Sequence, residues 1–303
     1  MTVLHFTVLP EEDGAQVKQI LHARGVSTRI TNRLKRLENG MRLNDAAVAR
    51  TIDFVRTGDV LTLQLPDDTN VLEPMPFDLD ILYEDEHLLV IDKPPTLAMH
   101  PTRSLQGNSL ANAVSGYMRG RGRSVVFRPV GRLDKGTSGV VVCALHAYAA
   151  SKLNGLVQKT YYAFVHGRYE GAGVFTNAIY RPKPNCTLRA CREENAPLLP
   201  GDEPAATHWE AIAQKDGVSF LKIRLETGRT HQIRAHFAHQ GTPLLGDDYY
   251  GAPAREEPGH FLHCGRADFI HPVAHGHLCV EAPMPAHMTL LFQIMKANQE
   301  DTP

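Results

Sequence analysis

Changes in the spacing of hydrophobic positions divide the first part of the chain into short elements. Residues 3–8 alternate like a strand, 17–25 carry a helical stripe, and 41–44 and 60–65 read as two more strands. A second helix is predicted between them. It starts at Ser27 or Thr28 as N-cap, ends at Gly40, and has one apolar face made by Ile30, Leu34 and Leu37.

The pattern after residue 79 alternates between apolar β-branched runs and helical stripes. A hairpin is predicted around the turn at 84–86, and 181–206 is predicted to be a loop-rich excursion because it is rich in Pro, Asn and Glu. The other predicted strands are 125–127, 140–142, 161–165, 207–213 and 218–225, and the other predicted helices are 109–119, 147–158 and 230–240. This mixture predicts an α+β fold.

Charge is distributed unevenly along the 303 residues, although the net charge is only −1. Between Lys18 and Arg56 there are nine Lys or Arg against three Asp or Glu, whereas 57–92 contains no Lys or Arg. We therefore expect three parts: a small basic domain at 1–66, an acidic, proline-containing linker at 67–78, and a large domain at 79–303.

Cysteine usage and the amino-terminal residues indicate a reducing compartment. The five cysteines are scattered and do not form a disulfide framework, and Cys143 is expected to be a buried thiol. No signal peptide is visible at the start, and no segment is apolar for long enough to span a bilayer. We expect a cytoplasmic protein.

Arg29, Arg33 and Arg36 lie four and three residues apart and share one face of the predicted second helix. Clustered guanidinium groups favour phosphate binding, although a charged helix face is often simply solvated. Residues 3–66 resemble the alpha-L RNA-binding module of ribosomal small-subunit protein four. The usual Arg-Leu-Asp opening of that module is replaced here by Gln16-Val17-Lys18. The resemblance implies that the three arginines contact RNA.

The segment Gly-Arg-Leu-Asp-Lys-Gly-Thr-Ser-Gly at 131–139 holds one carboxylate, Asp134, between two apolar strand predictions. A loop fixed between sheet strands can present a carboxylate to a pocket with little freedom to move. An ordinary Asp in a glycine-rich turn would have the same local sequence. This segment alone does not distinguish the two interpretations.

Three further segments give the Asp loop its context: Lys-Thr-Tyr at 159–161, Thr-Gly-Arg-Thr-His-Gln-Ile-Arg at 227–234, and Gly-Asp-Asp-Tyr-Tyr-Gly at 246–251. In this order and spacing, residues 79–290 resemble the RluA-type pseudouridine synthases. One departure is Gly131, where many members carry a histidine. The resemblance implies a mostly antiparallel mixed sheet with flanking helices and a central RNA cleft.

The resemblance also implies the reaction, conversion of uridine to pseudouridine in RNA, with Asp134 as the catalytic carboxylate. An ionised carboxylate can attack the anomeric carbon or remove the neighbouring ribose proton, and the sequence does not choose between these routes. A carboxylate in a nearly dry pocket needs a cation to stay ionised, and Arg234 is the candidate. Arg229, at the helix entrance, suits contact with the RNA backbone.

Tyr161 offers a flat ring for the uracil and a hydroxyl near the reacting base. On strand geometry Tyr162 points to the opposite face of the sheet. Leu225 and Ile233 are expected to wall the pocket, and Lys159 to contact RNA. Because a paired uridine must be flipped out to react, we expect the planar guanidinium of Arg132 to fill the vacated stack.

Other functions are possible on the residues alone. The 16 histidines invite a metal site, but none has the spacing of a zinc motif, so we expect no metal and, from the resemblance, no cofactor. Gly-Thr-Ser at 136–138 lacks the glycine spacing of a phosphate loop. The alternative function is a non-catalytic RNA-binding or ribosome-assembly protein. We expect a monomer whose partner is structured RNA, ribosomal RNA before tRNA.

Overall fold

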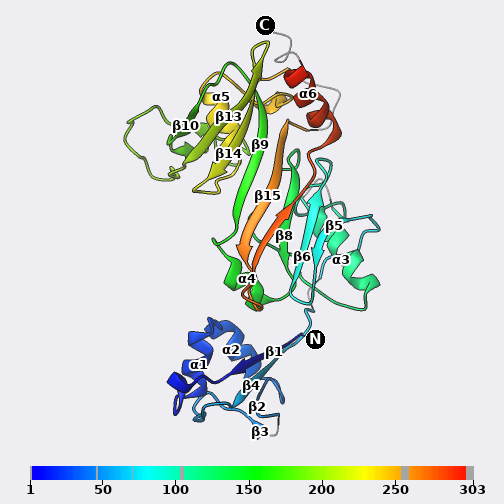
Figure 1. The fold of residues 1–303 in the computed structure, drawn as a ribbon, viewed down its shortest axis with the longest axis vertical. Helices are drawn as coiled ribbons and strands as arrows, with labels where there is room; N and C mark the ends of the chain where they lie inside the picture. Colours follow the sequence, from blue (N-terminus) through cyan, green and yellow to red (C-terminus); the bar gives the residue numbers. More distant parts are fainter. Residues whose placement is uncertain (1, 46, 70, 103–105, 254–258, 298–303) are drawn as a thin grey trace.

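A computed structural model describes residues 2–45, 47–69, 71–102, 106–253 and 259–297 (Figure 1). Residues 2–65 form a four-stranded antiparallel sheet in the order β1-β4-β2-β3 with a hydrophobic core of its own. Its elements are β1 (Thr2–Thr7), η1 (Pro10–Glu12), α1 (Val17–Ala23), α2 (Thr28–Leu34), β2 (Met41–Leu43), β3 (Ala47–Val48) and β4 (Val60–Leu65). As predicted, Ser27 caps α2: its hydroxyl accepts a hydrogen bond from the Ile30 N–H.

The rest of the chain is organised around a ten-stranded sheet in the order β10-β13-β14-β9-β15-β8-β6-β5, with β16 beside β15 and β7 beside β8. The strands are β5 (Asp80–Glu84), β6 (Leu88–Lys93), β7 (Arg128–Pro129), β8 (Ser138–Ala144), β9 (Gln158–His166), β10 (Ala172–Phe175), β13 (Thr207–Lys215), β14 (Val218–Leu225), β15 (Leu262–Ile270) and β16 (His277–Glu281). A small hairpin joins β11 (Ile179–Tyr180) to β12 (Ala190–Cys191). The helices are α3 (Leu110–Gly120), α4 (Ala147–Leu153), α5 (Gln232–His239) and α6 (Ala286–Ala297), with the 3-10 helix η2 (Asp248–Tyr250).

The large sheet is mixed and mostly antiparallel, as predicted. Among its described ladders only β8 and β15 pair in parallel, with His263 opposite Ser138 and Cys264 opposite Gly139. Alternation along β9 separates two cores: Tyr161 packs in the main core, and Tyr162 on the other face contacts the cluster beneath α6. The predicted opposition of these two tyrosines is confirmed.

The second helix is shorter than its sequence pattern suggests. It ends at Leu34 rather than Gly40, because the chain turns back so tightly that a Cβ at Gly40 would lie 2.1 Å from the Leu34 carbonyl oxygen. Leu37, predicted to be on the apolar face, is 38% exposed. Arg36 therefore lies outside the helix and does not continue the face of Arg29 and Arg33.

Two other predicted elements also differ. Residues 125–127 are not a strand, because the Val126 N–H donates to Asp68 Oδ2 of the preceding linker. In this stretch the pairing with β8 is made by β7, Arg128–Pro129. The helix predicted at 147–158 ends at Leu153, followed by Gly155 with a φ of +75°. The pattern gave no prediction for β15, β16 or α6.

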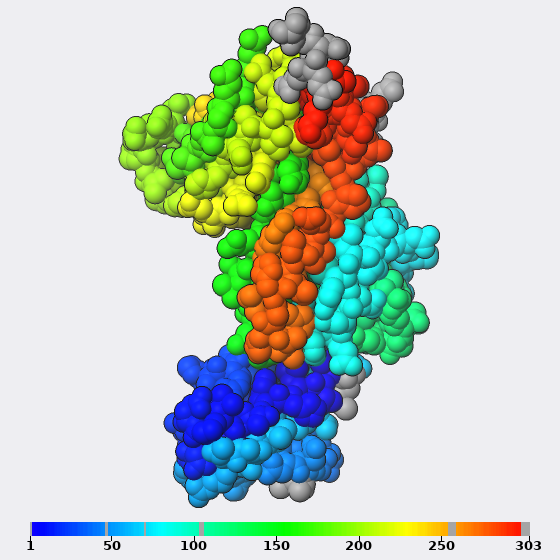
Figure 2. Space-filling view, in the orientation of Figure 1, coloured from blue at the N-terminus to red at the C-terminus, as the bar shows by residue number. Residues whose placement is uncertain are grey.

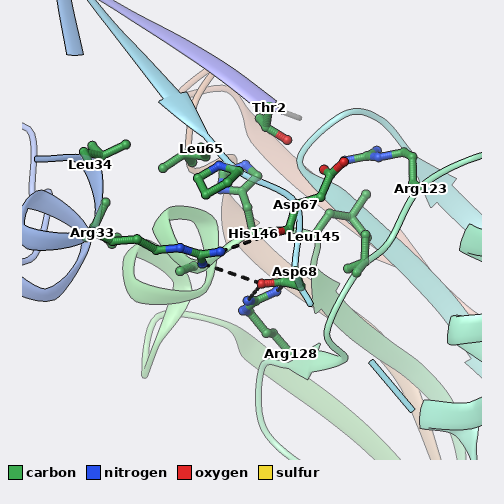
Figure 3. Close-up of a pocket in the computed structure, with 14 residues that line it drawn as sticks. Thr2, Arg33, Leu34, Leu65, Asp67, Asp68, Arg123, Arg128, Leu145 and His146 are labelled. Atoms are coloured by element: carbon green, nitrogen blue, oxygen red, sulfur yellow. Dashed lines mark hydrogen bonds and ion pairs between the residues drawn. The ribbon is translucent and has the colours of Figure 1, made fainter. Parts of the chain in front are cut away.

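Residues 67–78 contain no helix or strand among the described positions, but they are fastened along the large domain. Asn112 on α3 donates its side-chain N–H to the Glu73 carbonyl, and the Ser115 hydroxyl donates to that of Leu72. Asp68 accepts two hydrogen bonds from Arg128, at 2.7 Å each, and Arg33 from α2 lies 3.8 Å from the same carboxylate (Figure 3).

The two domains are in direct contact (Figure 2). Tyr148 of α4 is buried in the core of the N-terminal domain, where its ring contacts Phe6 and its hydroxyl donates to the Arg24 carbonyl. Val273, which follows β15, packs against the same core. The large domain thus supplies part of the hydrophobic core of the small one.

Candidate active site

The loop that carries Asp134 runs from β7 to β8 and is held from several sides. The Lys93 ammonium, fully buried at the end of β6, donates to the carbonyls of Pro94, Leu97 and Lys135. The Thr137 hydroxyl forms a 2.8 Å hydrogen bond with His260 Nε2. Burial lowers the pKa of Lys93 to about 7, while the charge of Asp134 opposes this shift. The loop is rigid because both its ends and its middle are bonded.

Arg234 of α5 reaches two carboxylates. Its Nη1 donates to Asp134 Oδ2 at 3.1 Å, and its Nε and Nη2 donate to the two oxygens of Asp247 at 2.7 and 2.9 Å. Burial alone would lower the pKa of Arg234, but hydrogen bonds and charge from Asp247, then Asp134, raise it. The guanidinium is therefore a permanent cation that holds Asp134 in one orientation.

The second oxygen of the catalytic candidate remains available. Asp134 Oδ1 accepts no hydrogen bond within the described part of the chain, and the side chain is 24% exposed. A carboxylate fixed at one oxygen and open at the other can act as a base or as a nucleophile. Positioning of this kind removes much of the entropic cost of the reaction.

His231 lies beside this pair, at the N-cap of α5. Its backbone is left-handed, with a φ of +56°, a strained conformation for a residue with a side chain. Its Nε2 lies 4.0 Å from Asp134 Oδ2 and its Nδ1 lies 3.1 Å from the Tyr250 hydroxyl. Burial lowers the pKa of His231, and the negative charge of Asp134 partly offsets this effect. The imidazole ring is therefore mainly neutral at pH 7.

Tyr161 lies where β8, β15 and β9 meet. It stands opposite Cys264 of β15 and is 7% exposed, and burial raises its pKa well above 10, so its hydroxyl stays protonated at neutral pH. The strands are unusually close here: Gly139 has a φ of +108°, and a Cβ on it would lie 2.2 Å from the Cys264 carbonyl oxygen. Glycine at 139 is what permits the parallel pairing beside the site.

A cleft of about 530 Å³ opens over Asp134, His231 and Arg234, and Tyr161 is not among the residues that line it. Its walls come from the Asp134 loop, the start of α5, η2 and the residues before β15, with Thr187 contributed by the excursion between β11 and β12. A cleft of this size accommodates a single nucleoside. The predicted central cleft is thus present, and its floor holds Asp134 and Arg234.

The other predicted pocket residues, Ile233, Leu225, Arg132 and Lys159, are not among those that line this cleft. Ile233 is buried in the main core, and Leu225, partly buried, packs against it. Arg132 is exposed at the rim and donates to the Thr230 hydroxyl at 3.1 Å. The Lys159 ammonium lies next to Gly131, where it would be 3.4 Å from a Cβ added to that glycine. Burial lowers the pKa of Lys159.

The remaining predicted RNA contacts lie elsewhere. Arg229 donates to the Pro204 carbonyl and pairs with Glu203 at 3.3 Å, so much of its guanidinium is already engaged. Arg33 is held by the linker through the Asp67 carbonyl and Asp68. Arg29 and Arg36 are exposed on the N-terminal domain. The fold does not bring these three N-terminal arginines to the cleft.

Sequence reasoning missed several residues of the site. Asp247 lies in the Gly-Asp-Asp-Tyr-Tyr-Gly segment, but the sequence does not show which of the two aspartates, Asp247 or Asp248, points into the protein. The position of Lys93 at the end of an apolar strand was a detectable signal. A lysine there either has hydrogen-bond partners in the protein interior or reaches solvent. His231 lay within the 227–234 segment but was given no role in the site, and His260 had no signal, because the roles of both depend on contacts between distant segments.

Metal and membrane interpretations find no support in the described residues. No group of three or more His, Cys, Asp or Glu side chains among them is arranged to hold a metal ion. Within the same residues, no helix combines the length and apolar character needed to cross a membrane. Cys143 is a fully buried free thiol, as predicted.

Comparison with known proteins places the chain among enzymes that modify uridine. Residues 87–239 match the family described as RNA pseudouridylate synthase. A Bacillus subtilis (strain 168) protein described as the uncharacterized RNA pseudouridine synthase YjbO is 34% identical over 91% of this chain and 98% of its own length. Ribosomal large subunit pseudouridine synthase D of Zymomonas mobilis subsp. mobilis is 35% identical over 76% of both chains.

Solved structures support the fold. Human RNA pseudouridylate synthase domain containing 4 aligns with a TM-score of 0.57 at 19% identity, covering 72% of this chain and 93% of that one. Human RNA pseudouridylate synthase domain containing 1 aligns with a TM-score of 0.56 at 22% identity, covering 77% and 99%. At these identities the likeness concerns the fold alone.

Proposed function

The chain belongs to the RNA pseudouridylate synthase family and is an isomerase that acts on RNA, and we propose that Asp134 is its catalytic carboxylate. The observation that carries this proposal is the contact between Asp134 and Arg234, 100 residues apart in sequence, on the floor of a nucleoside-sized cleft. A permanently charged guanidinium beside a carboxylate keeps the latter available as a base or nucleophile.

Two routes are compatible with this carboxylate. Asp134 attacks the anomeric carbon as the ring nitrogen leaves, or it removes the proton from the neighbouring ribose carbon as the glycosidic bond breaks. In both, the released uracil rotates and one of its ring carbons forms the new bond to the anomeric carbon. In the first route the ester between Asp134 and the sugar breaks as this bond forms, and in the second the ribose carbon regains its proton. The ring carbon then loses its proton and the ring nitrogen takes one up, so that product and substrate are isomers.

Tyr161 and Arg132 complete the proposed site. The Tyr161 ring borders the position of the uracil, and its protonated hydroxyl is a hydrogen-bond donor beside the reacting base. We propose that Arg132, whose exposed guanidinium donates to the Thr230 hydroxyl, fills the gap that an extruded uridine leaves in its helix. Leu225 and Ile233 exclude water, and Lys159 adds positive charge near the Asp134 loop.

We propose ribosomal RNA as the first substrate class and tRNA as the second, because several relatives are named as ribosomal large subunit pseudouridine synthases. Such a substrate places the activity in the cytoplasm. The domain of residues 1–66 is proposed to bind structured RNA through its exposed arginines, with 67–78 fastening it to the catalytic domain of residues 79–303. A monomer suffices for this arrangement.

The test uses purified protein, unmodified transcripts of large-subunit ribosomal RNA and of tRNA, and detection of pseudouridine by carbodiimide adducts that stop primer extension. Wild type is expected to create stops at specific uridines, and Asp134→Asn to create none while keeping its folded spectrum and its RNA affinity. Undiminished turnover by Asp134→Asn would exclude this residue. RNA binding by wild type without any pseudouridine would favour the alternative, a non-catalytic RNA-binding protein.

A further inference from the structure

Arg189, at the end of the loop between β11 and β12, is a buried cation without a carboxylate partner in the part of the chain that the structure describes. It is 9% exposed, and its Nη1 donates to three carbonyls in the turn before it, those of Cys186, Thr187 and Leu188, at 2.8–3.2 Å. No ion pair of Arg189 occurs among the described residues. Buried arginines are normally paired with an acid, so this one has an unbalanced charge.

The other edge of this guanidinium is free. Nε and Nη2 of Arg189 donate to no described residue, and neither is a fully buried atom, in contrast to Nε of Arg42. The three carbonyls fix the plane of the group, so this edge points in one direction with two parallel donors. Such a fork is the geometry that binds phosphate or carboxylate in a bidentate manner.

Arg189 is attached directly to the active site. Its backbone N–H donates to the Tyr250 hydroxyl at 3.0 Å, and that hydroxyl lies 3.1 Å from Nδ1 of His231. Two residues earlier, the Thr187 hydroxyl bonds that of Tyr249 at 2.5 Å, and both residues line the cleft. The loop therefore forms a wall of the cleft, with its cation just behind the lining.

The electrostatics of the cleft favour such a cation. Its lining contains two acids, Asp134 and Asp248, against two cations, Lys135 and Arg234, and Asp247 lies immediately behind Arg234. Added positive charge beside these carboxylates favours the approach of a nucleotide's phosphates. Residues 181–189 supply it, since they contain Arg181, Lys183 and Arg189 and no acidic residue.

We propose that the free edge of Arg189 binds a backbone phosphate of the RNA strand next to the reacting uridine. This assigns a function to the excursion between β11 and β12 and rests on the proposed function only in taking RNA as the ligand. Arg192, three residues on, has the opposite arrangement: its Nε and Nη2 are both bound to Asp202. It is the matched control, a neighbouring arginine whose Nε–Nη2 edge, the one left open in Arg189, is already occupied by a carboxylate.

The experiment measures RNA affinity, because binding does not depend on turnover. Arg189→Gln, Arg189→Lys and Arg192→Gln are compared with wild type for binding to an unmodified large-subunit ribosomal RNA transcript between 50 and 200 mM salt. Loss of one phosphate contact is expected to weaken binding of Arg189→Gln about 10-fold and to reduce the slope of log affinity against log salt by about 0.7–0.9. Arg192→Gln is expected to keep the wild-type slope.

Arg189→Lys distinguishes a loss of phosphate binding from a loss of folding. Its ammonium has three donors for the three carbonyls and no second edge, so it is expected to melt like wild type but to bind RNA more weakly. Wild-type affinity and slope in both Arg189 variants would overturn the phosphate site even if the enzyme is active. A reduced slope in an enzyme that forms no pseudouridine would retain the phosphate site and reject the proposed catalysis.

Discussion

Arg234 and Asp247 form a buried ion pair in which two nitrogens of the guanidinium meet both carboxylate oxygens, at 2.7 and 2.9 Å. This pair uses one edge of Arg234 and leaves Nη1 aimed at Asp134. Asp247 thus acts through Arg234, as a positioning residue, and it orients the catalytic candidate without reaching the cleft surface itself.

Removing Asp247 should therefore impair both stability and turnover. Asp247→Ala strands a buried guanidinium and is expected to lower the free energy of unfolding by about 3–5 kcal/mol. Asp247→Asn keeps the shape but loses the charge, so kcat is expected to fall more than KM changes. Urea unfolding and single-turnover kinetics measure the two effects.

Asp202→Asn is the control for this prediction, because it breaks a similar bidentate pair with Arg192 away from the cleft. It is expected to lower stability while kcat stays near wild type. A normal kcat in folded Asp247→Asn would show that Arg234 does not depend on this support.

Tyr161→Phe should distinguish the contribution of the aromatic ring to turnover from that of the hydroxyl. The phenol remains protonated at neutral pH because burial raises its pKa, so it serves as a donor. Without it, kcat is expected to fall at least about 100-fold while RNA affinity and melting temperature change little. The equivalent change at Tyr162, which faces the opposite core, is expected to leave kcat unaltered. Equal activity of the two variants would contradict a role for the Tyr161 hydroxyl.

Lys93 predicts a specific dependence of stability on pH. Its pKa is about 7 in the folded protein against 10.5 for the exposed group, so the unfolded chain binds an extra proton between these values. Stability conferred by this group therefore rises with pH from about 7 towards 10.5, by up to about 1.4 kcal/mol per pH unit. Lys93→Met should lack that increase.

The measurement is urea unfolding of both proteins at pH values from 6 to 9. The difference between wild type and Lys93→Met is informative because titrating groups that do not interact with Lys93 cancel. Asp92 is the exception: burial raises its pKa to about 6 and the charge of Lys93 opposes this shift, so the comparison rests on the range above pH 7. Stability curves that run parallel over the whole range would mean that Lys93 does not change its protonation there.

Gly139 should tolerate no side chain. Its φ of +108° and the 2.2 Å approach of an added Cβ to the Cys264 carbonyl predict that Gly139→Ala lowers the free energy of unfolding by more than about 3 kcal/mol. Gly155→Ala isolates the backbone effect, because Gly155 has a φ of +75° with nothing within 4 Å of the added carbon. It is expected to cost about 1–2 kcal/mol. Similar losses in thermal or urea unfolding would argue against a close approach of β8 and β15.

Tyr148 should control the attachment of the N-terminal domain. Tyr148→Ala removes a large side chain from the core of that domain and is expected to cost about 3–5 kcal/mol and to accelerate proteolysis within residues 66–78. Tyr148→Phe loses only the hydrogen bond to the Arg24 carbonyl, at about 1 kcal/mol. Unchanged cleavage of the alanine variant would show that the linker contacts alone hold the domains together.

Much of the local structure was readable because hydrophobic periodicity reports which face of a segment is buried. The hairpin of β5 and β6, the apolar strand β8, the Ser27 cap and the alternation of Tyr161 with Tyr162 all follow from it. The same reasoning failed at residues 125–127, where an apolar run bonds to Asp68 instead of pairing in the sheet.

The sequence by itself predicted which side chains would carry chemistry, among them Asp134, Arg234 and Tyr161, because the order and spacing of their segments resemble those of a known family. The tertiary structure alone decided which charges meet: Asp247 supports Arg234, Asp68 engages Arg33, and Arg189 meets no acid among the described residues. Pairing of charges from distant segments depends on strand register and on how loops pack across the sheet. Local sequence contains neither, and for that reason the electrostatics of the site became visible only in three dimensions.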